Sequence, residues 1–136
     1  MKRASLPWMK YFVGDWAKLT AAMSIAERGA YQRLVEHYWT AGSLSSDEAA
    51  IARVAGASPD EWSQVRDAVL SMFEADSQAG VWRCELIDDL REKQEREYRQ
   101  QVEAGRLGAE ARKAKRAAQA LPSGQGTVLP YPKPSG

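Results

Sequence analysis

The chain has 136 residues, and its 19 lysines and arginines nearly balance 18 aspartates and glutamates, so the formal net charge is +1. This balance excludes a uniformly basic nucleic-acid coat protein and an acidic disordered protein. Cys84 is the single cysteine and cannot form an intramolecular disulfide. No apolar run reaches the roughly 18 residues needed to span a membrane, and residues 1–7 lack the apolar core of a signal peptide. We therefore expect one cytoplasmic domain with no membrane partner.

The aromatic residues predict where the core lies. Ten of the twelve fall between Trp8 and Trp82, and each can bury roughly 150–250 Å². We predict a winged-helix-like domain over residues 1–90, a charged and basic helical extension over residues 91–120, and a disordered tail rich in proline and glycine over residues 121–136.

The first elements are predicted from apolar density and capping signals. Residues 8–16 favour a short strand that leads into a helical turn. Ser24 and Glu27 form a capping box, which predicts a helix that ends at Gly42. Apolar residues at helical spacing define the buried face of this helix: Ile25, Tyr31, Leu34, Val35, Tyr38 and Trp39.

Two further helices and a hairpin are predicted next. Ser46 is expected to cap a short helix that Gly56 ends, and Ser58, followed by Pro59 and Glu61, is the strongest helix-start signal in the chain. Turn residues 77–80 then separate two short extended segments, the second being residues 81–84, which predicts a hairpin.

A long helix is expected from Leu86 onward. Beyond Leu90 its large apolar residues do not sustain a heptad seam, which favours a charged, solvent-exposed helix. The fold class predicted is mainly α: a winged helix-turn-helix-like domain with a small β-hairpin, then a long charged C-terminal helix and a disordered tail.

Several stretches together resemble the YdaU-like prophage domain family. They are Tyr11–Trp16 (YFVGDW), Gly29–Leu34 (GAYQRL) with His37-Tyr38 and Gly42–Leu44 (GSL), Trp82-Arg83, and Ala104–Ala109 (AGRLGA). The resemblance covers roughly residues 8–112. It implies a phage replication-module protein with a winged-helix domain, which binds a replication origin or a replicative helicase, and it supplies no catalytic residues.

The cations near the C-terminal end of the long helix are consistent with two interpretations, a DNA-binding arm or a solubilising helix end whose cations complement the helix dipole. Residues 106–116 carry five cations against Glu110, for a net charge of +4, and phosphate contacts dominate affinity for nucleic acid. Residues 59–74, the predicted groove-binding helix, carry four acids against one arginine, a net charge of −3 that disfavours groove insertion. The candidate DNA-binding residues are Arg106, Arg112, Lys113, Lys115, Arg116, Lys2, Arg3, Arg66 and Arg83.

The partner predicted first is therefore double- or single-stranded DNA. One alternative is an adaptor for a replicative helicase or another phage protein, and another is a winged-helix transcriptional regulator that binds an operator through residues 59–74 and the hairpin. The aromatic residues Trp8, Tyr11, Phe12 and Trp16 could form a docking face, although core packing is commoner, and the Pro-rich residues 129–134 could be a docked peptide or a plain linker.

No feature points to an enzyme, a cofactor or a metal site. His37 is expected to be a structural histidine near the core, and Cys84 a small packed residue. One cysteine and one distant histidine make no zinc pattern, and no phosphate-binding loop is found. Asp88, Asp89 and Glu92 are expected to form a solvated first helical turn. The sequence makes no prediction of oligomeric state.

Overall fold

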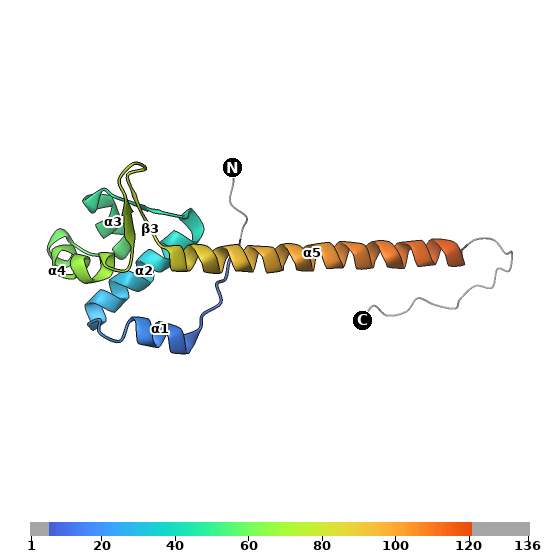
Figure 1. Ribbon diagram of the computed structural model, residues 1–136, viewed down its shortest axis with the longest axis horizontal. Helices are drawn as coiled ribbons and strands as arrows, with labels where there is room; N and C mark the ends of the chain where they lie inside the picture. Colours follow the sequence, from blue (N-terminus) through green and yellow to red (C-terminus); the bar gives the residue numbers. More distant parts are fainter. Residues whose placement is uncertain (1–5, 121–136) are drawn as a thin grey trace. The chain divides into compact units, whose positions relative to one another are not determined.

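Figure 1 shows the computed structural model of the chain, which describes residues 6–120. The chain divides into two compact units, Met1–Arg96 and Glu97–Gly136. The first unit contains helices α1 to α4, strands β1 to β3 and the beginning of α5, and the second continues α5. The element bounds are α1 Val13–Leu19, α2 Ile25–Ala41, β1 Leu44–Ser45, α3 Glu48–Ala55, α4 Pro59–Leu70, β2 Glu74–Asp76, β3 Val81–Arg83 and α5 Glu85–Gln119.

The fold class is confirmed: the chain is mainly helical, with a small antiparallel sheet and a long C-terminal helix. The domain boundary at residue 90 stays a prediction. The tail predicted at residues 121–136 lies outside the described residues.

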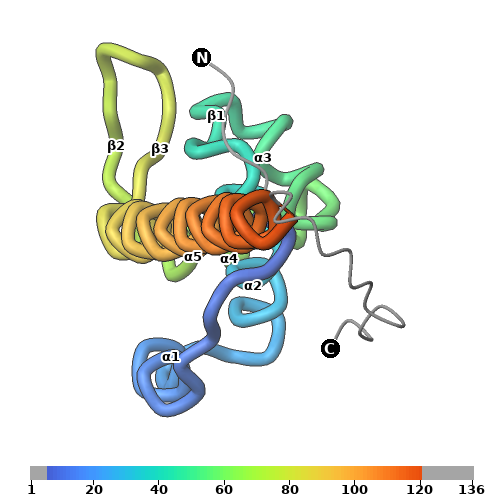
Figure 2. Tube along the Cα trace, turned by 90° about the vertical axis from the view of Figure 1, so that its right-hand side faces the viewer, coloured from blue at the N-terminus to red at the C-terminus, as the bar shows by residue number. Residues whose placement is uncertain are grey.

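The small sheet gives the first unit its winged architecture. Strand β3 lies between β1 and β2, and both pairings are antiparallel. Trp82 in β3 faces Leu44 on one side and Ala75 on the other. Figure 2 shows β2 and β3 as a hairpin that lies apart from α1. Helices α3 and α4 follow β1 directly, and both pack on α2 (Figure 1). The β2–β3 hairpin comes directly after α4, which is the position of the wing in a winged helix-turn-helix domain.

Local capping chemistry sets the ends of the helices, as predicted. Ser24 caps α2 and Ser58 caps α4, each in a complete capping box, with Pro59 at the start of α4. Gly42 and Gly56 end α2 and α3 with φ values of 84° and 74°, in the left-handed region that favours glycine. The predicted cap at Ser46 is wrong. Asp47 rather than Ser46 precedes α3, and it makes no side-chain cap bond. The Ser46 backbone N–H donates to the Gly80 carbonyl and prolongs the pairing of β1 with β3.

The core is centred on one face of α2. Tyr31, Leu34, Val35 and Tyr38 are almost fully buried, and they pack with residues from α3, α4, the sheet and α5. The most deeply buried of these partners are Leu44, Ile51, Val69 and Ile87. Phe73 lies against the rings of Tyr31 and Tyr38, with centroids 5.9 and 6.0 Å apart. This cluster explains why the aromatic residues concentrate before residue 90.

The predicted strand within residues 8–16 is wrong. Residues 6–12 form no regular element before α1, because side chains of other helices bind their backbone. The Trp39 indole N–H donates to the Leu6 carbonyl at 2.8 Å, and the Gln94 amide donates to the Trp8 carbonyl at 2.6 Å. Gln94 also accepts from the Lys10 backbone N–H at 3.2 Å. These bonds tie the segment to α2 and α5 rather than to a neighbouring strand.

Part of the aromatic strip is also exposed, against the expectation of core packing. Trp16 is buried, whereas Trp8, Tyr11 and Phe12 each keep about half of their surface in solvent. The Tyr11 ring stacks on Trp16 with centroids 5.5 Å apart. The segment therefore has one anchoring aromatic and three that present apolar surface to solvent.

Two predictions on α2 are wrong. Ile25 is 95% exposed, because it follows the capping serine in a first turn that faces solvent. His37 is also exposed rather than packed near the core, because it lies outside the buried face of α2.

The beginning of α5 is tied to α2 by a buried tyrosine. The Tyr38 hydroxyl accepts from the Cys84 backbone N–H and donates to Asp88 Oδ1, both at 2.8 Å. Burial raises the pKa of Tyr38 to about 12. Arg91, also buried, donates to the Trp39 carbonyl at 2.8 Å and lies over its ring at 4.9 Å. These contacts hold the first turns of α5 in the first unit.

In the second unit α5 continues from Glu97 to Gln119 with almost every side chain exposed, as the charged pattern predicts. Within residues 6–120, no helix has the length and apolar composition required to cross a membrane.

Candidate nucleic-acid interface

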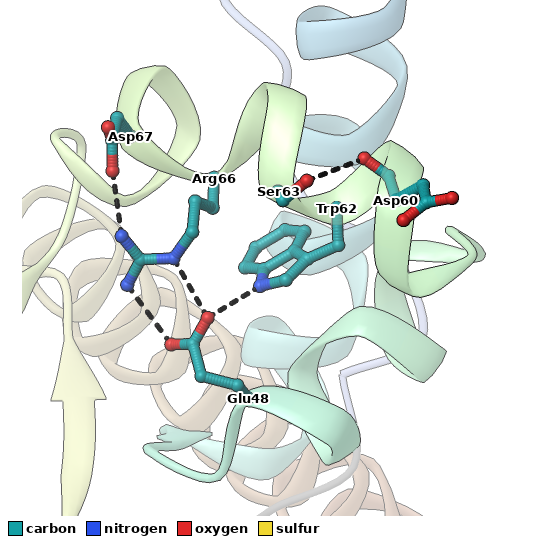
Figure 3. Close-up of polar contacts among 6 residues, drawn as sticks. All are labelled: Glu48, Asp60, Trp62, Ser63, Arg66 and Asp67. Atoms are coloured by element: carbon teal, nitrogen blue, oxygen red, sulfur yellow. Dashed lines mark hydrogen bonds and ion pairs between the residues drawn. The ribbon is translucent and has the colours of Figure 1, made fainter.

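Arg66 is the single cation of the helix that a winged domain would insert into a DNA groove, and carboxylates hold it on both sides (Figure 3). Its Nε donates to Glu48 Oε1 at 2.8 Å and its Nη2 to Glu48 Oε2 at 3.1 Å. Its Nη1 donates to Asp67 Oδ1 at 2.7 Å. The Trp62 indole N–H donates to the same Glu48 oxygen that accepts from Nε, at 2.8 Å. This network joins α3 to α4 and uses all three guanidinium nitrogens of Arg66.

The network changes the electrostatics of α4. The Arg66 hydrogen bond holds the pKa of Glu48 below its usual range, and Glu48 in turn raises the pKa of Arg66. Carboxylates of the protein itself thus neutralise the positive charge of the Arg66 guanidinium. A DNA phosphate would have to displace a bidentate carboxylate to reach it.

The cation of the wing is engaged in the same way. Arg83 Nε in β3 donates to Asp76 Oδ2 in β2 at 3.0 Å, across the hairpin. This hydrogen bond is the main reason that the pKa of Asp76 lies below its usual range. The structure therefore gives Arg66 and Arg83 separate carboxylate partners.

The basic segment, residues 106–116 of α5, contains one engaged cation and four open ones. Arg106 pairs with Glu103 and Glu110, one turn away on either side. Within residues 6–120, the remaining cations of the segment have no carboxylate partner, and all are exposed: Arg112, Lys113, Lys115 and Arg116. The candidate residues Lys2 and Arg3 lie outside the described residues.

An apolar groove in the first unit was missed by sequence reasoning. It has a volume of about 460 Å³ and lies between α1 and the start of α5, lined by Phe12, Asp15, Trp16, Leu19, Leu86, Asp89, Leu90 and Lys93. Leu86, an apolar residue in the first turn of α5, is 55% exposed. The spacing of Leu86, Leu90 and Lys93 is an amphipathic signal that could have indicated this surface.

The two titratable groups singled out in the sequence, Cys84 and His37, differ in exposure. Cys84 is buried, as predicted, and burial raises the pKa of its thiol. His37 lies on the surface of α2. No group of three or more histidines, cysteines, aspartates or glutamates within residues 6–120 is placed to hold a metal ion.

Element order, sheet order and the position of the wing define the first unit as a winged helix-turn-helix domain. Residues 7–90 match the family described as "Protein of unknown function (DUF1376)", and the chain belongs to this family. No match was found among the curated proteins or among the solved structures.

Proposed function

We propose that the chain is a phage or prophage replication-module protein that binds DNA in the cytoplasm, in replication initiation or helicase recruitment. In this proposal the winged-helix domain is a scaffold, and the basic segment contacts DNA phosphates. The resemblance to prophage domains supports the biological setting, and the distribution of engaged and open cations supports the mode of binding.

The observation that carries the proposal is the contrast between two sets of cations. Arg66 and Arg83 each bind a carboxylate of their own domain, whereas Arg112, Lys113 and Arg116 are exposed without one in the described chain. A phosphate can bind an open cation without breaking an ion pair, so the open set is the less costly surface for DNA.

The test is a salt titration of DNA binding by the full-length protein. Each phosphate contact contributes about 0.9 to the slope of log K against log salt on duplex DNA. A variant without the four open cations should show a slope reduced by about 3–4 and weak binding at low salt. It carries glutamine in place of Arg112, Lys113, Lys115 and Arg116.

A matched control removes four exposed cations from the first unit and should keep the slope of the wild type. It carries glutamine in place of Lys18, Arg28, Arg53 and Lys93, all of which are exposed. Equal binding by both variants would show that net charge rather than the basic segment determines affinity, and would refute the proposal.

A second candidate function is an adaptor for a replicative helicase or another phage replication protein. The exposed groove beside α1 favours it, because an apolar surface lined by Asp15 and Asp89 suits a partner with apolar and basic side chains. Leu86→Glu should then abolish recovery of a replication protein from host lysate while DNA affinity is retained. Recovery of no replication protein by the wild-type chain would count against this function.

The regulator alternative requires α4 and the wing to read an operator. Arg66→Ala combined with Arg83→Ala should then reduce discrimination between operator and random DNA by about 1–3 kcal/mol for each base that the two arginines recognise. Unchanged discrimination would remove this alternative.

A further inference from the structure

A pocket of the first unit lies where α2, β1 and α3 meet. Its volume of about 420 Å³ is in the range of pockets that hold small ligands. Leu44 and Ile51 are almost fully buried and form an apolar floor, whereas the polar lining residues are exposed. The lining of this α2–α3 pocket consists of His37 from α2, Leu44 and Ser45 from β1, and Ala50, Ile51, Arg53 and Val54 from α3.

Three side chains of the α2–α3 pocket are able to donate hydrogen bonds to a ligand. The Arg53 guanidinium and the His37 imidazole have no hydrogen bond or ion pair within residues 6–120. A neutral imidazole still carries one N–H donor, so His37 can donate in either protonation state. Ser45 Oγ accepts from the Asp47 backbone N–H at 3.1 Å, which positions the hydroxyl and leaves its proton for a ligand.

A second guanidinium adds positive charge beside the α2–α3 pocket. Arg33 Nε donates to the carbonyl of Val54, a lining residue, at 3.3 Å. None of the described residues that line the pocket is an aspartate or a glutamate. Of the nearby carboxylates, Glu48 is held by Arg66, and Glu36 accepts from another side chain of α2. An anion can therefore reach the cations of the pocket without displacing a bound carboxylate.

These donors match a terminal phosphate better than a phosphate within a DNA strand. A phosphate monoester carries a charge of about −1.5 to −2 and three acceptor oxygens, whereas a phosphodiester carries one charge and leaves two oxygens free. A guanidinium binds two oxygens in its fork, and the imidazole and the hydroxyl can donate to the third. The apolar floor suits the flat face of a nucleobase, because a sugar phosphate would bury its hydroxyl groups there.

We propose that the α2–α3 pocket binds a nucleoside monophosphate, with the terminal phosphate on Arg53, His37 and Ser45 and the base on the apolar floor. The phosphate belongs either to a free mononucleotide or to the phosphorylated end of a DNA strand, since both present the same group. The site uses residues of the first unit alone and does not rest on DNA binding by the basic segment.

The first test uses His37 as its own reporter. It is the single histidine of the chain, so the imidazole signals of an NMR spectrum come from this pocket alone. Deoxyadenosine monophosphate, added to the full-length protein at fixed pH and ionic strength, should shift these signals along a saturating curve. Deoxyadenosine, which has no phosphate, should leave them in place.

Two variants at exposed arginines test the role of Arg53. Arg53→Gln should weaken the affinity for the nucleotide about tenfold or more, because charge-assisted hydrogen bonds are lost. Arg28→Gln is the matched control, since Arg28 is exposed on α2 and does not line the pocket. It should leave the affinity unchanged. Circular dichroism verifies that both variants keep the helical content of the wild type.

A competition experiment separates the two sources of the phosphate. It uses the full-length variant without the four open cations, so that binding at the basic segment does not interfere. Displacement of the nucleotide by an oligonucleotide with a 5′-phosphate identifies strand ends as ligands, and no displacement identifies the free nucleotide. The same oligonucleotide with a 5′-hydroxyl should not compete in either case.

Four outcomes would overturn the proposal: no saturable shift of the His37 signals, an equal response to deoxyadenosine, equal affinities of the two glutamine variants, or displacement by the 5′-hydroxyl oligonucleotide. Because nucleotide binding is measured at His37, and DNA affinity by the separate salt titration, either proposal can fail while the other holds.

Discussion

Replacement of Tyr38 by phenylalanine should destabilise the domain by about 2–4 kcal/mol, and the structure shows where this loss arises. The change keeps the buried ring and removes only the hydroxyl. The Cys84 backbone N–H, buried at the start of α5, then loses its acceptor, and Asp88 loses a donor. An unsatisfied buried N–H costs about 1–3 kcal/mol, and the bond to the half-buried carboxylate adds about 1 kcal/mol after solvent compensation.

Tyr31 on the same helix is the matched control. It is as deeply buried as Tyr38, but its hydroxyl has no hydrogen-bond partner within the described residues. Tyr31→Phe should therefore leave stability unchanged or raise it by about 1 kcal/mol, because an uncompensated polar group leaves the core. Urea unfolding followed by tryptophan fluorescence measures both variants. Equal losses, or a loss below about 1 kcal/mol for Tyr38→Phe, would refute the assignment of Tyr38 as the residue that anchors α5.

Two further predictions concern α3 and its surroundings. Because Arg66 holds the pKa of Glu48 below its ordinary value of 4.5, the pair stabilises the fold above that pH, and the contribution is lost as the pH falls through the folded-state pKa. Thermal melting between neutral and acidic pH should show less acid destabilisation in Glu48→Gln, and parallel curves for the two proteins would contradict this. Gly56→Ala should cost about 1–3 kcal/mol, since a residue with φ of 74° is strained and its Cβ would lie 3.0 Å from Arg33. Gly29→Ala within α2, where a Cβ meets nothing within 4 Å, should stabilise by about 0.5–1 kcal/mol, and chemical denaturation that fails to separate the two alanine variants would reject the backbone argument.

The sequence predicted the elements whose limits depend on local chemistry. The boxes at Ser24 and Ser58 and the glycines at 42 and 56 act within one turn of the chain, and all four mark helix ends in the structure. The same logic failed at Ser46. This residue belongs to the end of the β1–β3 pairing, where its backbone N–H donates to the carbonyl of Gly80, far along the chain. The segment before α1 failed for a related reason, since Trp39 and Gln94 bind its backbone from distant helices.

The ion pairs of the arginines also differ in whether the sequence could predict them. The spacing of Glu103, Arg106 and Glu110 is enough to predict their pairing from the sequence. The partner of Arg66 could not be predicted this way, because Glu48 lies on another helix, 18 residues earlier. Sequence reasoning could count the charges of each segment, but only the packing of α3 on α4 shows which of them are already neutralised.

The anchoring of α5 has a consequence for how its basic segment forms. A free helix must first order one turn for a single hydrogen bond, an unfavourable nucleation step that leaves short isolated helices marginal in water. In this chain Tyr38 and Arg91 hold the first turns of α5 within a folded domain. The domain thus supplies the nucleus, and residues up to Gln119 extend an existing helix one residue at a time. A synthetic peptide of residues 97–120 lacks that nucleus and should be far less helical than the same residues in the intact protein.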